Sequence, residues 1–236
     1  MKRIEDVCFV IQARLNSERT PGKMMNPFAG TSLVEIACQK IKQSNIIPNE
    51  NFYFSAYEKP IIDAVERSGL QVYYRSKKSA LAEGPMQVVM EYHDKLDYKY
   101  LVVISACCPL LGVSTIDKFV RAYLESENDG MFAVFEKRNY FWDQNHDMIT
   151  GWPSGLDALN TKFVEVTYEA AHCLYAGKMS TIKDGIWMAE QPFTKNKPEL
   201  FIVPEFEVFD IDFPWQFTVA EILYVTDLVA PVKEDE

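Results

Sequence analysis

Short apolar runs of strand length alternate with amphipathic stretches along the first half of the chain, and this alternation limits the fold more than any other feature. The stretch SLVEIACQKIKQ, for example, spaces Leu33, Ile36, Ala37 and Ile41 as on one face of a helix. Because the strands are apolar along their whole length, they indicate an α/β fold with a mostly parallel sheet that helices cover on both faces. The expected strands are 7–13, 51–56, 70–75, 100–106 and 131–135, and the expected helices are 32–43, 61–69, 85–96 and 113–126.

The regular alternation stops at about residue 138. Residues 138–165 are aromatic and polar without a period, and we expect an inserted arm, a dimerisation segment or a lid there. Two further strands are expected at 166–178 and 200–204. A last helix is expected at 215–229, with an apolar stripe along one side. The 236 residues are predicted to form a single domain, 1–236. The apolar stripe of the last expected helix consists of Phe217, Ala220, Ile222, Leu223 and Leu228.

Composition excludes several classes of function. The net charge of −10 argues against binding to a nucleic-acid backbone, which depends on clustered Lys and Arg. The five cysteines show no paired spacing, so neither a disulfide framework nor a structural zinc site is expected. No apolar run reaches the roughly 18 residues that a membrane helix needs, and the first residues do not form a secretory signal. We therefore expect a cytoplasmic protein without a membrane partner.

The loop that follows the first expected strand gathers positive charge. Between Ala13 and Lys23 it contains three cations, two small polar side chains and a Pro-Gly turn. In a parallel sheet, ligands bind at the carboxyl ends of the strands, and a triphosphate needs cations and inward-pointing amides there. The spacing of a Walker loop is absent. From the residues alone, a phosphate site and a solvated basic loop are equally acceptable interpretations.

Two acidic residues near the end of the chain, Asp210 and Asp212, form a second candidate site. Residues two apart in an extended segment project to the same side, so both carboxylates can reach one cation. Magnesium prefers oxygen ligands and commonly takes one or two carboxylates together with phosphate oxygens and water. Alternatively, the doublet only provides negative charge at the start of the last helix.

The segment ARLNSERTPGKMMNPFAGTSL resembles the opening motif of the sugar cytidylyltransferases. Residues 12–23 are similar to QARxxSxRLPGK of the spore coat polysaccharide cytidylyltransferase-like branch, with Thr20 in place of Leu. The motif ARxxSxxxPxKN of the acylneuraminate branch is related. The resemblance implies a Rossmann-like nucleotidyltransferase fold with a mostly parallel twisted sheet. It also implies that the CTP phosphates are bound by Arg14, Ser17 and Lys23, with Arg19 in support, and that Asn16 faces the base or a phosphate.

Three later segments agree with this resemblance. Arg75 follows the third expected strand, where these families place an arginine that approaches the nucleotide. ISACCPLLGVSTID resembles TGDCPLxxxxxID of the spore coat branch, and EVFDIDF resembles the DIDxxxDF motif of the acylneuraminate branch. The resemblance implies that Asp210 and Asp212 bind Mg²⁺, and that Arg14, Lys23 and Asp212 are the catalytic residues.

Several positions depart from both branches. Cys107 stands where the spore coat branch has an Asp that helps to hold the metal. Ser105 replaces a Gln of the acylneuraminate branch, and Leu111 replaces an Arg; both family residues lie in the segment that recognises the sugar. We expect Ser105 and Lys137 to contact the substrate, Lys137 as the replacement cation. His172 takes the place of Gly in an Asn-Gly pair, and we interpret it as a packed residue without a catalytic role.

The sequence thus predicts a homodimeric cytidylyltransferase that joins CMP from CTP to an acidic sugar, of the sialic-acid-like or 3-deoxy-ulosonic kind, with release of pyrophosphate. Mg²⁺ is the expected cofactor, and CTP and the sugar are the expected small-molecule partners. Two alternatives remain. The chain is a nucleotide- or sugar-binding protein on the same fold that has lost turnover, or it is a cytidylyltransferase for a non-sugar acceptor.

Overall fold

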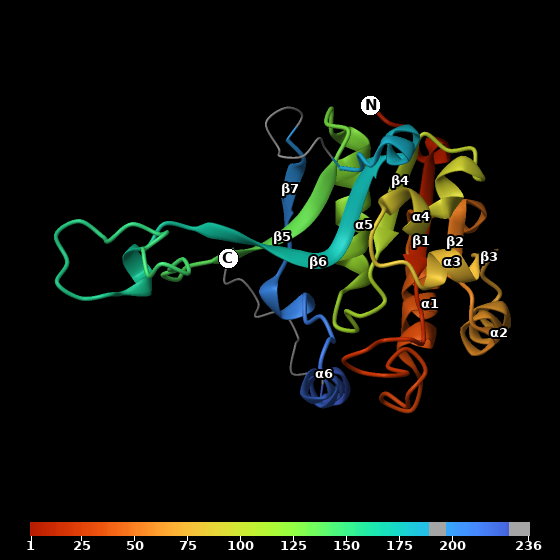
Figure 1. Ribbon diagram of the computed structural model, residues 1–236, viewed down its shortest axis with the longest axis horizontal. Coiled ribbons are helices and arrows are strands. Elements are labelled where there is room, and N and C mark those ends of the chain that lie inside the picture. The colour runs from red at the N-terminus through yellow and green to blue at the C-terminus, as the bar shows by residue number, and fades with distance from the viewer. Residues whose placement is uncertain (189–196, 227–236) are drawn as a thin grey trace.

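A seven-stranded sheet with the order β3-β2-β1-β4-β6-β5-β7 forms the centre of the computed structural model, which describes residues 1–188 and 197–226 (Figure 1). Strands β3, β2, β1 and β4 run parallel to one another, so their carboxyl ends share one edge. The mostly parallel α/β fold predicted from the sequence is therefore confirmed. The strands are β1 (Val7–Gln12), β2 (Phe52–Ala56), β3 (Val72–Tyr74), β4 (Tyr100–Ile104), β5 (Met131–Lys137), β6 (Thr167–Lys178) and β7 (Glu199–Ile202).

Side chains of β1 alternate between two hydrophobic clusters, because successive residues of a strand point to opposite faces. Val7, Phe9 and Ile11 belong to the larger cluster, whereas Cys8 and Val10 belong to the smaller one. The larger cluster also contains residues of α1, α2 and α5, and two 3-10 helices, 91–94 and 179–184, supply residues to the smaller one. Both faces of the sheet are thus covered. The helices are α1 (Leu33–Gln43), α2 (Lys59–Ser68), α3 (Lys77–Ala80), α4 (Met86–Val89), α5 (Val113–Glu125) and α6 (Pro214–Thr226).

Local chemistry explains where the helices begin and end. Ser32 caps α1, because its hydroxyl accepts a hydrogen bond from the backbone N–H of Glu35. Gly69 ends α2 at φ 79°, a left-handed conformation that glycine adopts without strain.

The helix predicted at 85–96 is wrong as a continuous element. It divides at Met90 into α4 and a 3-10 helix at 91–94. The carbonyl of Val89 accepts hydrogen bonds from Gln12 Nε2 (3.1 Å) and Ser79 Oγ (2.9 Å). These bonds tie the end of α4 to β1 and to α3, and the next residue, Met90, leaves the helical conformation.

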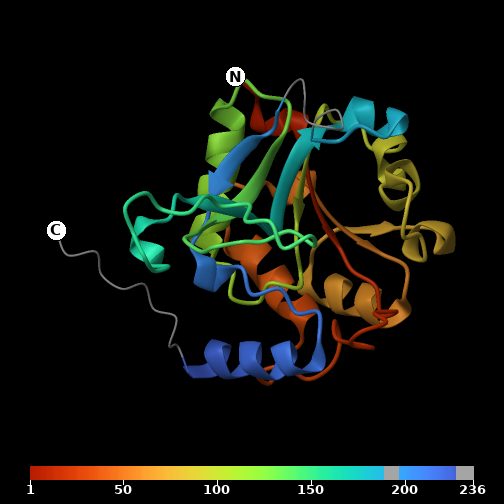
Figure 2. The ribbon, with the colours of Figure 1, turned by 60° about the vertical axis from the view of Figure 1, so that its left-hand side comes forward.

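Strand β6 runs antiparallel to both of its neighbours, β4 and β5. The strand itself was predicted, but its direction was not. Between β5 and β6 the chain leaves the sheet, and residues 138–166 project away from the body of the molecule (Figures 1 and 2). Whether this segment is an arm of a single domain stays a prediction.

Helix α6 lies beside the segment that follows the β1 loop (Figure 2). Phe28 packs edge-to-face against Phe217 and Tyr224, and Glu221 accepts a hydrogen bond from the backbone N–H of Ala29 (2.7 Å). The helix ends at residue 226 in the structure, so Leu228 of the predicted stripe lies outside the described residues. Among the described helices, none is long and apolar enough to cross a bilayer.

Candidate functional site

The loop after β1 folds back on itself at the carboxyl edge of the sheet. The backbone N–H groups of Ser17 and Gly22 both donate to the carbonyl of Leu15, at 2.9 and 3.1 Å. Gly22 has φ 71°, and a Cβ at this position would meet Asn26 Oδ1 at 3.1 Å. The turn therefore depends on glycine, because another residue would be strained there. The Pro-Gly pair noted in the sequence makes this bend.

Asp212 meets two cations of this loop. Arg19 Nη2 lies 2.6 Å from Asp212 Oδ1, and Lys23 Nζ lies 3.7 Å from the same oxygen. Lys23 also donates a hydrogen bond to the carbonyl of Ile211, and Thr20 Oγ1 donates to the carbonyl of Asp212 (2.8 Å). The sequence separates these partners by almost the full domain. The structure thus brings Lys23 and Asp212 together, which the sharing of one ligand requires.

Asp210 lies close to this pair, and Asp210 and Asp212 are both half-buried. Burial and, secondly, the neighbouring charge of Asp212 raise the pKa of the Asp210 carboxyl, although Lys23, His172 and Arg19 act in the opposite direction. Two carboxylates that repel each other are stabilised when a cation binds to both.

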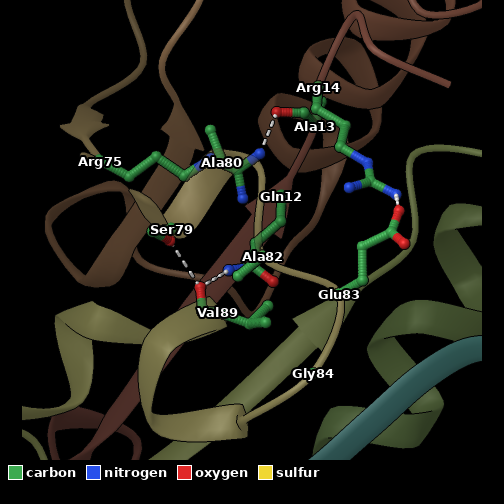
Figure 3. A pocket seen from close by; sticks show the side chains of 10 residues that line it. All are labelled: Gln12, Ala13, Arg14, Arg75, Ser79, Ala80, Ala82, Glu83, Gly84 and Val89. Carbon is green, nitrogen blue, oxygen red and sulfur yellow. Dashed lines mark hydrogen bonds and ion pairs between the residues drawn. The ribbon is translucent and has the colours of Figure 1, made fainter. Parts of the chain in front are cut away.

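Two adjoining cavities lie against the loop. The first has a volume of about 540 Å³, and its lining includes Ser17, Arg19, Lys23, Cys107 and Asp212. The second has a volume of about 340 Å³ and extends toward β3 and α3 (Figure 3). Both cavities are lined by Gln12, Ala13, Arg14 and Glu83.

An ion pair stands where the two cavities meet. Arg14 Nη2 lies 3.1 Å from Glu83 Oε1, and both side chains keep part of their surface exposed (Figure 3). The two cavities share the Arg14 and Glu83 side chains in their linings. An elongated ligand that fills both must therefore contact or displace this pair.

Arg75 forms the far wall of the second cavity. Its side chain is buried, and Nη2 donates a hydrogen bond to the carbonyl of Ala13 (2.9 Å). Among the described residues, Arg75 Nε has no hydrogen-bond partner. Burial lowers the pKa of the guanidinium. The neighbouring cation Arg14 lowers it further, whereas Glu58 and Tyr92 raise it. Because Arg75 lines this cavity, its guanidinium is suited to a polar ligand atom there.

Four of the predicted site residues are outside the linings that the described residues give to these two cavities: Asn16, Ser105, Lys137 and Asp210, the last of which lies two residues from Asp212. Asn16 belongs to the same loop as the cations. Ser105 lines a separate small void, and its hydroxyl accepts a hydrogen bond from the N–H of Cys107 (3.1 Å). Lys137 pairs with Glu205 and, at 4.0 Å, with Glu169. The structure does not bring Ser105 and Lys137 together with the loop cations, and their roles stay predictions.

The sequence interpretation missed two residues and misjudged a third. Glu83 has no local signal, because its partner Arg14 lies 69 positions away. Tyr175, whose hydroxyl oxygen lies 2.8 Å from His172 Nδ1, was not singled out from the sequence either. His172 is exposed, with φ 52°, so the expectation that it packs in the core is wrong. The signal was present, since a position where relatives carry glycine often has a positive φ.

The donor set at the acidic pair fits magnesium. In the described part of the chain, no cluster of three or more His, Cys, Asp or Glu side chains is placed to hold a metal. Magnesium does not need such a cluster, because it commonly takes one or two carboxylates and completes its shell with phosphate oxygens and water. Asp210 and Asp212 can provide the protein ligands. Cys107 adds no charge, because burial raises the pKa of its thiol.

Comparison with known proteins identifies the family of the chain. The family model described as "Cytidylyltransferase" matches residues 8–198. The pseudaminic acid cytidylyltransferase of Campylobacter jejuni is 20% identical over 235 residues, covering 94% of this chain and 97% of the relative. The spore coat polysaccharide biosynthesis protein SpsF of Bacillus subtilis is 21% identical over 137 residues. That match covers 56% of this chain, which spans only 55% of SpsF.

Solved structures show the same fold. A CMP:2-keto-3-deoxy-manno-octonic acid synthetase complexed with CTP superposes with a TM-score of 0.66 at 13% identity, covering 94% of this chain and 99% of the other. A 4-diphosphocytidyl-2C-methyl-D-erythritol synthase from Anaerococcus prevotii gives 0.62 at 12% identity, covering 93% and 96%. At these identities the superpositions establish the fold alone. Because the family model matches well over half of the sequence, the chain belongs to the cytidylyltransferase family and is a CTP-dependent nucleotidyltransferase.

Proposed function

We propose that the chain transfers CMP from CTP to an acidic sugar of the sialic-acid-like or 3-deoxy-ulosonic kind, and that the CMP-sugar serves the synthesis of a glycan or surface polysaccharide. One observation supports this most strongly. Arg19 and Lys23 reach Asp212 at the wall of a cavity that adjoins a second cavity ending at Arg75. A nucleoside triphosphate has the matching form, with a charged chain at one end and a polar base at the other.

The residues divide between the two ends of CTP. Arg14, Ser17, Arg19 and Lys23 bind the phosphates, because the loop places these donors around the larger cavity. Arg75 binds the nucleoside, because its buried guanidinium faces the adjoining cavity. Asn16, in the same loop, supports the base or a phosphate. Lysine 23 is held rigidly by its hydrogen bond to the carbonyl of Ile211, so its charge is already in position when CTP arrives.

The reaction is an in-line displacement at the α-phosphorus. A hydroxyl oxygen of the sugar forms the new bond to the α-phosphorus and loses its proton to solvent. The bond from the α-phosphorus to the oxygen that bridges to the β-phosphorus breaks, and that oxygen leaves with pyrophosphate. Positioning and neutralisation of charge account for most of the catalysis in such transfers. Arg14 and Lys23 offset charge on the phosphates, and Asp212 orients both Arg19 and Lys23. Mg²⁺, held by Asp210 and Asp212, supplies further neutralisation of the triphosphate when bound.

Turnover with defined acceptors tests this proposal. The protein is incubated with CTP, MgCl₂ and one of several acids, including pseudaminic acid and 2-keto-3-deoxy-manno-octonic acid, and pyrophosphate is measured. We expect pyrophosphate with CTP and at least one acid, and its loss in Lys23→Met and Asp212→Asn. Lys42→Met is the matched control, because Lys42 only donates to the carbonyl of Ser68 on the surface. Equal turnover in Lys23→Met and Lys42→Met contradicts the proposed site.

One observation favours a second candidate function. Cys107 lines the larger cavity together with Asp212, and its half-buried thiol, whose pKa desolvation raises, offers no negative charge to a cation. This observation favours, as the second candidate, a protein that binds CTP or a sugar without turnover. Calorimetry with CTP, together with the pyrophosphate assay, distinguishes the two functions. The acceptors in the assay include non-sugar phosphonates and alditol phosphates. CTP binding without pyrophosphate release from any acceptor identifies the binding protein.

The assembly and location predicted from the sequence are part of the proposal. Aromatic side chains on the projecting segment are exposed, among them Trp142 (48%), Trp152 (52%) and Phe163 (59%). Burying them against a second copy is favourable, because large exposed apolar side chains gain free energy when removed from water. We propose a homodimer in the cytoplasm. Light scattering after gel filtration tests the dimer, and a monomer at micromolar concentration contradicts it.

A further inference from the structure

Three elements hold the backbone of the segment that carries Asp212. The N–H of Ile211 donates to the carbonyl of Cys107 (3.0 Å) in the loop after β4, and the Ile211 carbonyl accepts a hydrogen bond from Lys23 Nζ in the loop after β1. The N–H of Asp212 donates to Gln216 Oε1 (2.7 Å) in α6. A segment outside helices and strands needs such partners for its backbone polar groups. Because these partners come from different parts of the fold, they fix the backbone from several sides.

Thr20 holds the polar group that remains, the carbonyl of Asp212. Thr20 Oγ1 donates to this carbonyl at 2.8 Å, and Thr20 is buried, with 6% of its surface exposed. Within the loop after β1, the N–H of Thr20 donates to Ser17 Oγ (3.3 Å), and the Thr20 carbonyl accepts a hydrogen bond from the N–H of Lys23 (3.2 Å). Leu, which the spore coat motif has at this position, carries no hydroxyl. The hydrogen bond that ties the loop to Asp212 therefore depends on the residue in which this chain departs from that motif.

The ion pairs of the Asp212 carboxylate restrain it less firmly. Arg19 Nη2, 2.6 Å from Asp212 Oδ1, belongs to a side chain that is 56% exposed, and Lys23 Nζ lies 3.7 Å from the same oxygen. The Arg19 guanidinium also lies over the Phe213 ring, 5.3 Å from its centroid. Exposed ion pairs contribute little because water and salt screen them, whereas a hydrogen bond from a buried hydroxyl is costly to lose. The Thr20 hydroxyl is therefore the stronger restraint on the position of Asp212.

We propose that Thr20 is a positioning residue. Its hydroxyl, through the Asp212 carbonyl, holds the Asp212 carboxylate against Arg19 and Lys23, where the carboxylate takes part in binding CTP together with Mg²⁺. This inference rests on the proposed function, since Asp212 is assigned its role there. Thr20 is absent from the linings that the described residues give to the two cavities, so it acts through Asp212 and not on a substrate.

Two substitutions separate the hydroxyl of Thr20 from its shape. Thr20→Val keeps the volume and removes the donor, whereas Thr20→Ser keeps the donor. In Thr20→Val we expect the Kd for CTP in MgCl₂, measured by calorimetry, to rise about two- to tenfold, the usual effect of one hydrogen bond. Thr20→Ser should bind CTP nearly as tightly as the unaltered protein does. Equal Kd values for Thr20→Val and the unaltered protein, or for Thr20→Val and Thr20→Ser, overturn the proposal.

Thr181→Val is the matched control. It also removes a hydroxyl that donates to a carbonyl, that of Lys178 (3.1 Å). Lys178 pairs with Tyr100 at the start of β4, so this control lies at the edge of the sheet opposite the loop cations. Thr181→Val should leave the Kd for CTP unchanged. A rise equal to that in Thr20→Val shows a general effect of losing such a bond, and overturns the proposal.

A double-mutant cycle shows whether Thr20 acts through Asp212. In an Asp212→Asn background we expect Thr20→Val to change the Kd for CTP less than about twofold, because the carboxylate that the hydroxyl positions is already gone. A purely structural role of Thr20 would weaken CTP binding by the same factor in both backgrounds, and that result overturns the proposal.

Crystal structures without CTP separate this inference from the proposed function. We expect the contact between Arg19 Nη2 and Asp212 Oδ1 to be kept in Thr20→Ser and lost in Thr20→Val. A contact that is kept in Thr20→Val contradicts the positioning role, whether or not CTP binds. Failure of the unaltered protein to bind CTP counts against the proposed function alone, because the two crystal structures still decide whether Thr20 positions Asp212.

Discussion

The ion pair between Arg14 and Glu83 makes a quantitative prediction for CTP binding. Glu83 competes with phosphate for Arg14, because Nη2 of the guanidinium already lies 3.1 Å from Glu83 Oε1. The side chains of Arg14 and Glu83 are 35% and 63% exposed, and exposed pairs of this kind contribute about 0.2–1 kcal/mol. Glu83→Gln keeps the shape of the side chain and removes the charge. At about 1.4 kcal/mol per factor of ten, the affinity for CTP should rise about 1.4- to 5-fold.

Calorimetry with CTP in MgCl₂ measures this change, and the difference between the two proteins should shrink as salt screens the pair. Asp63→Asn is the matched control, since it removes the Lys59–Asp63 pair (2.6 Å) on the surface of α2. The control should bind CTP like the unchanged protein. A Glu83→Gln variant that binds CTP equally or more weakly would refute the idea that Glu83 competes with the triphosphate for Arg14.

Three further predictions concern stability. The pKa of Asp210 is raised in the folded state, so the folded protein binds this proton more tightly than the unfolded chain does. Stability therefore falls as pH rises from the ordinary pKa of an Asp carboxyl through the raised one. Asp210→Asn should raise Tm at neutral pH in metal-free buffer, while pyrophosphate release falls. Burial lowers the pKa of Lys40 to about 8, against an ordinary value of 10.5. The free energy of unfolding should therefore rise between these pH values by on the order of 3 kcal/mol relative to Lys40→Met, as measured by urea denaturation. Gly177→Ala places a Cβ 2.4 Å from Trp187 Cδ1, and should cost about 1–3 kcal/mol in the same assay, with an unchanged midpoint contradicting the packing.

The strands and most helices were predictable because their signals are local. The strand β1 is apolar at every position from Val7 to Ile11, and such a run has few alternatives to a buried strand. The break at Met90 was not predictable, since it depends on hydrogen bonds to the Val89 carbonyl from residues that precede it by 77 and 10 positions. The reversed direction of β6 depends in the same way on pairing between distant segments.

The residues of the candidate site were likewise predictable only in part. The contact between Lys23 and Asp212 follows from two sequence motifs and the rule that parallel strands place their carboxyl ends at one edge. Glu83 could not be derived in that way, since it matters through a single distant partner. The exposed position of His172 could not be derived either, since it depends on a backbone angle.

The antiparallel direction of β6 makes the two sides of the carboxyl edge of the sheet different. On the nucleotide side the edge is formed by a loop that follows a strand, and a loop can adjust to the molecule that it encloses. On the other side β6 enters the sheet at that same edge, so the residue exposed there is fixed by ladders to β4 and β5. Amide hydrogen exchange should therefore slow markedly in residues 13–23 when CTP binds and change little around residue 173. If the proposed function holds, the loop adjusts to CTP, whereas the edge formed by β6 keeps the shape that its two ladders give it.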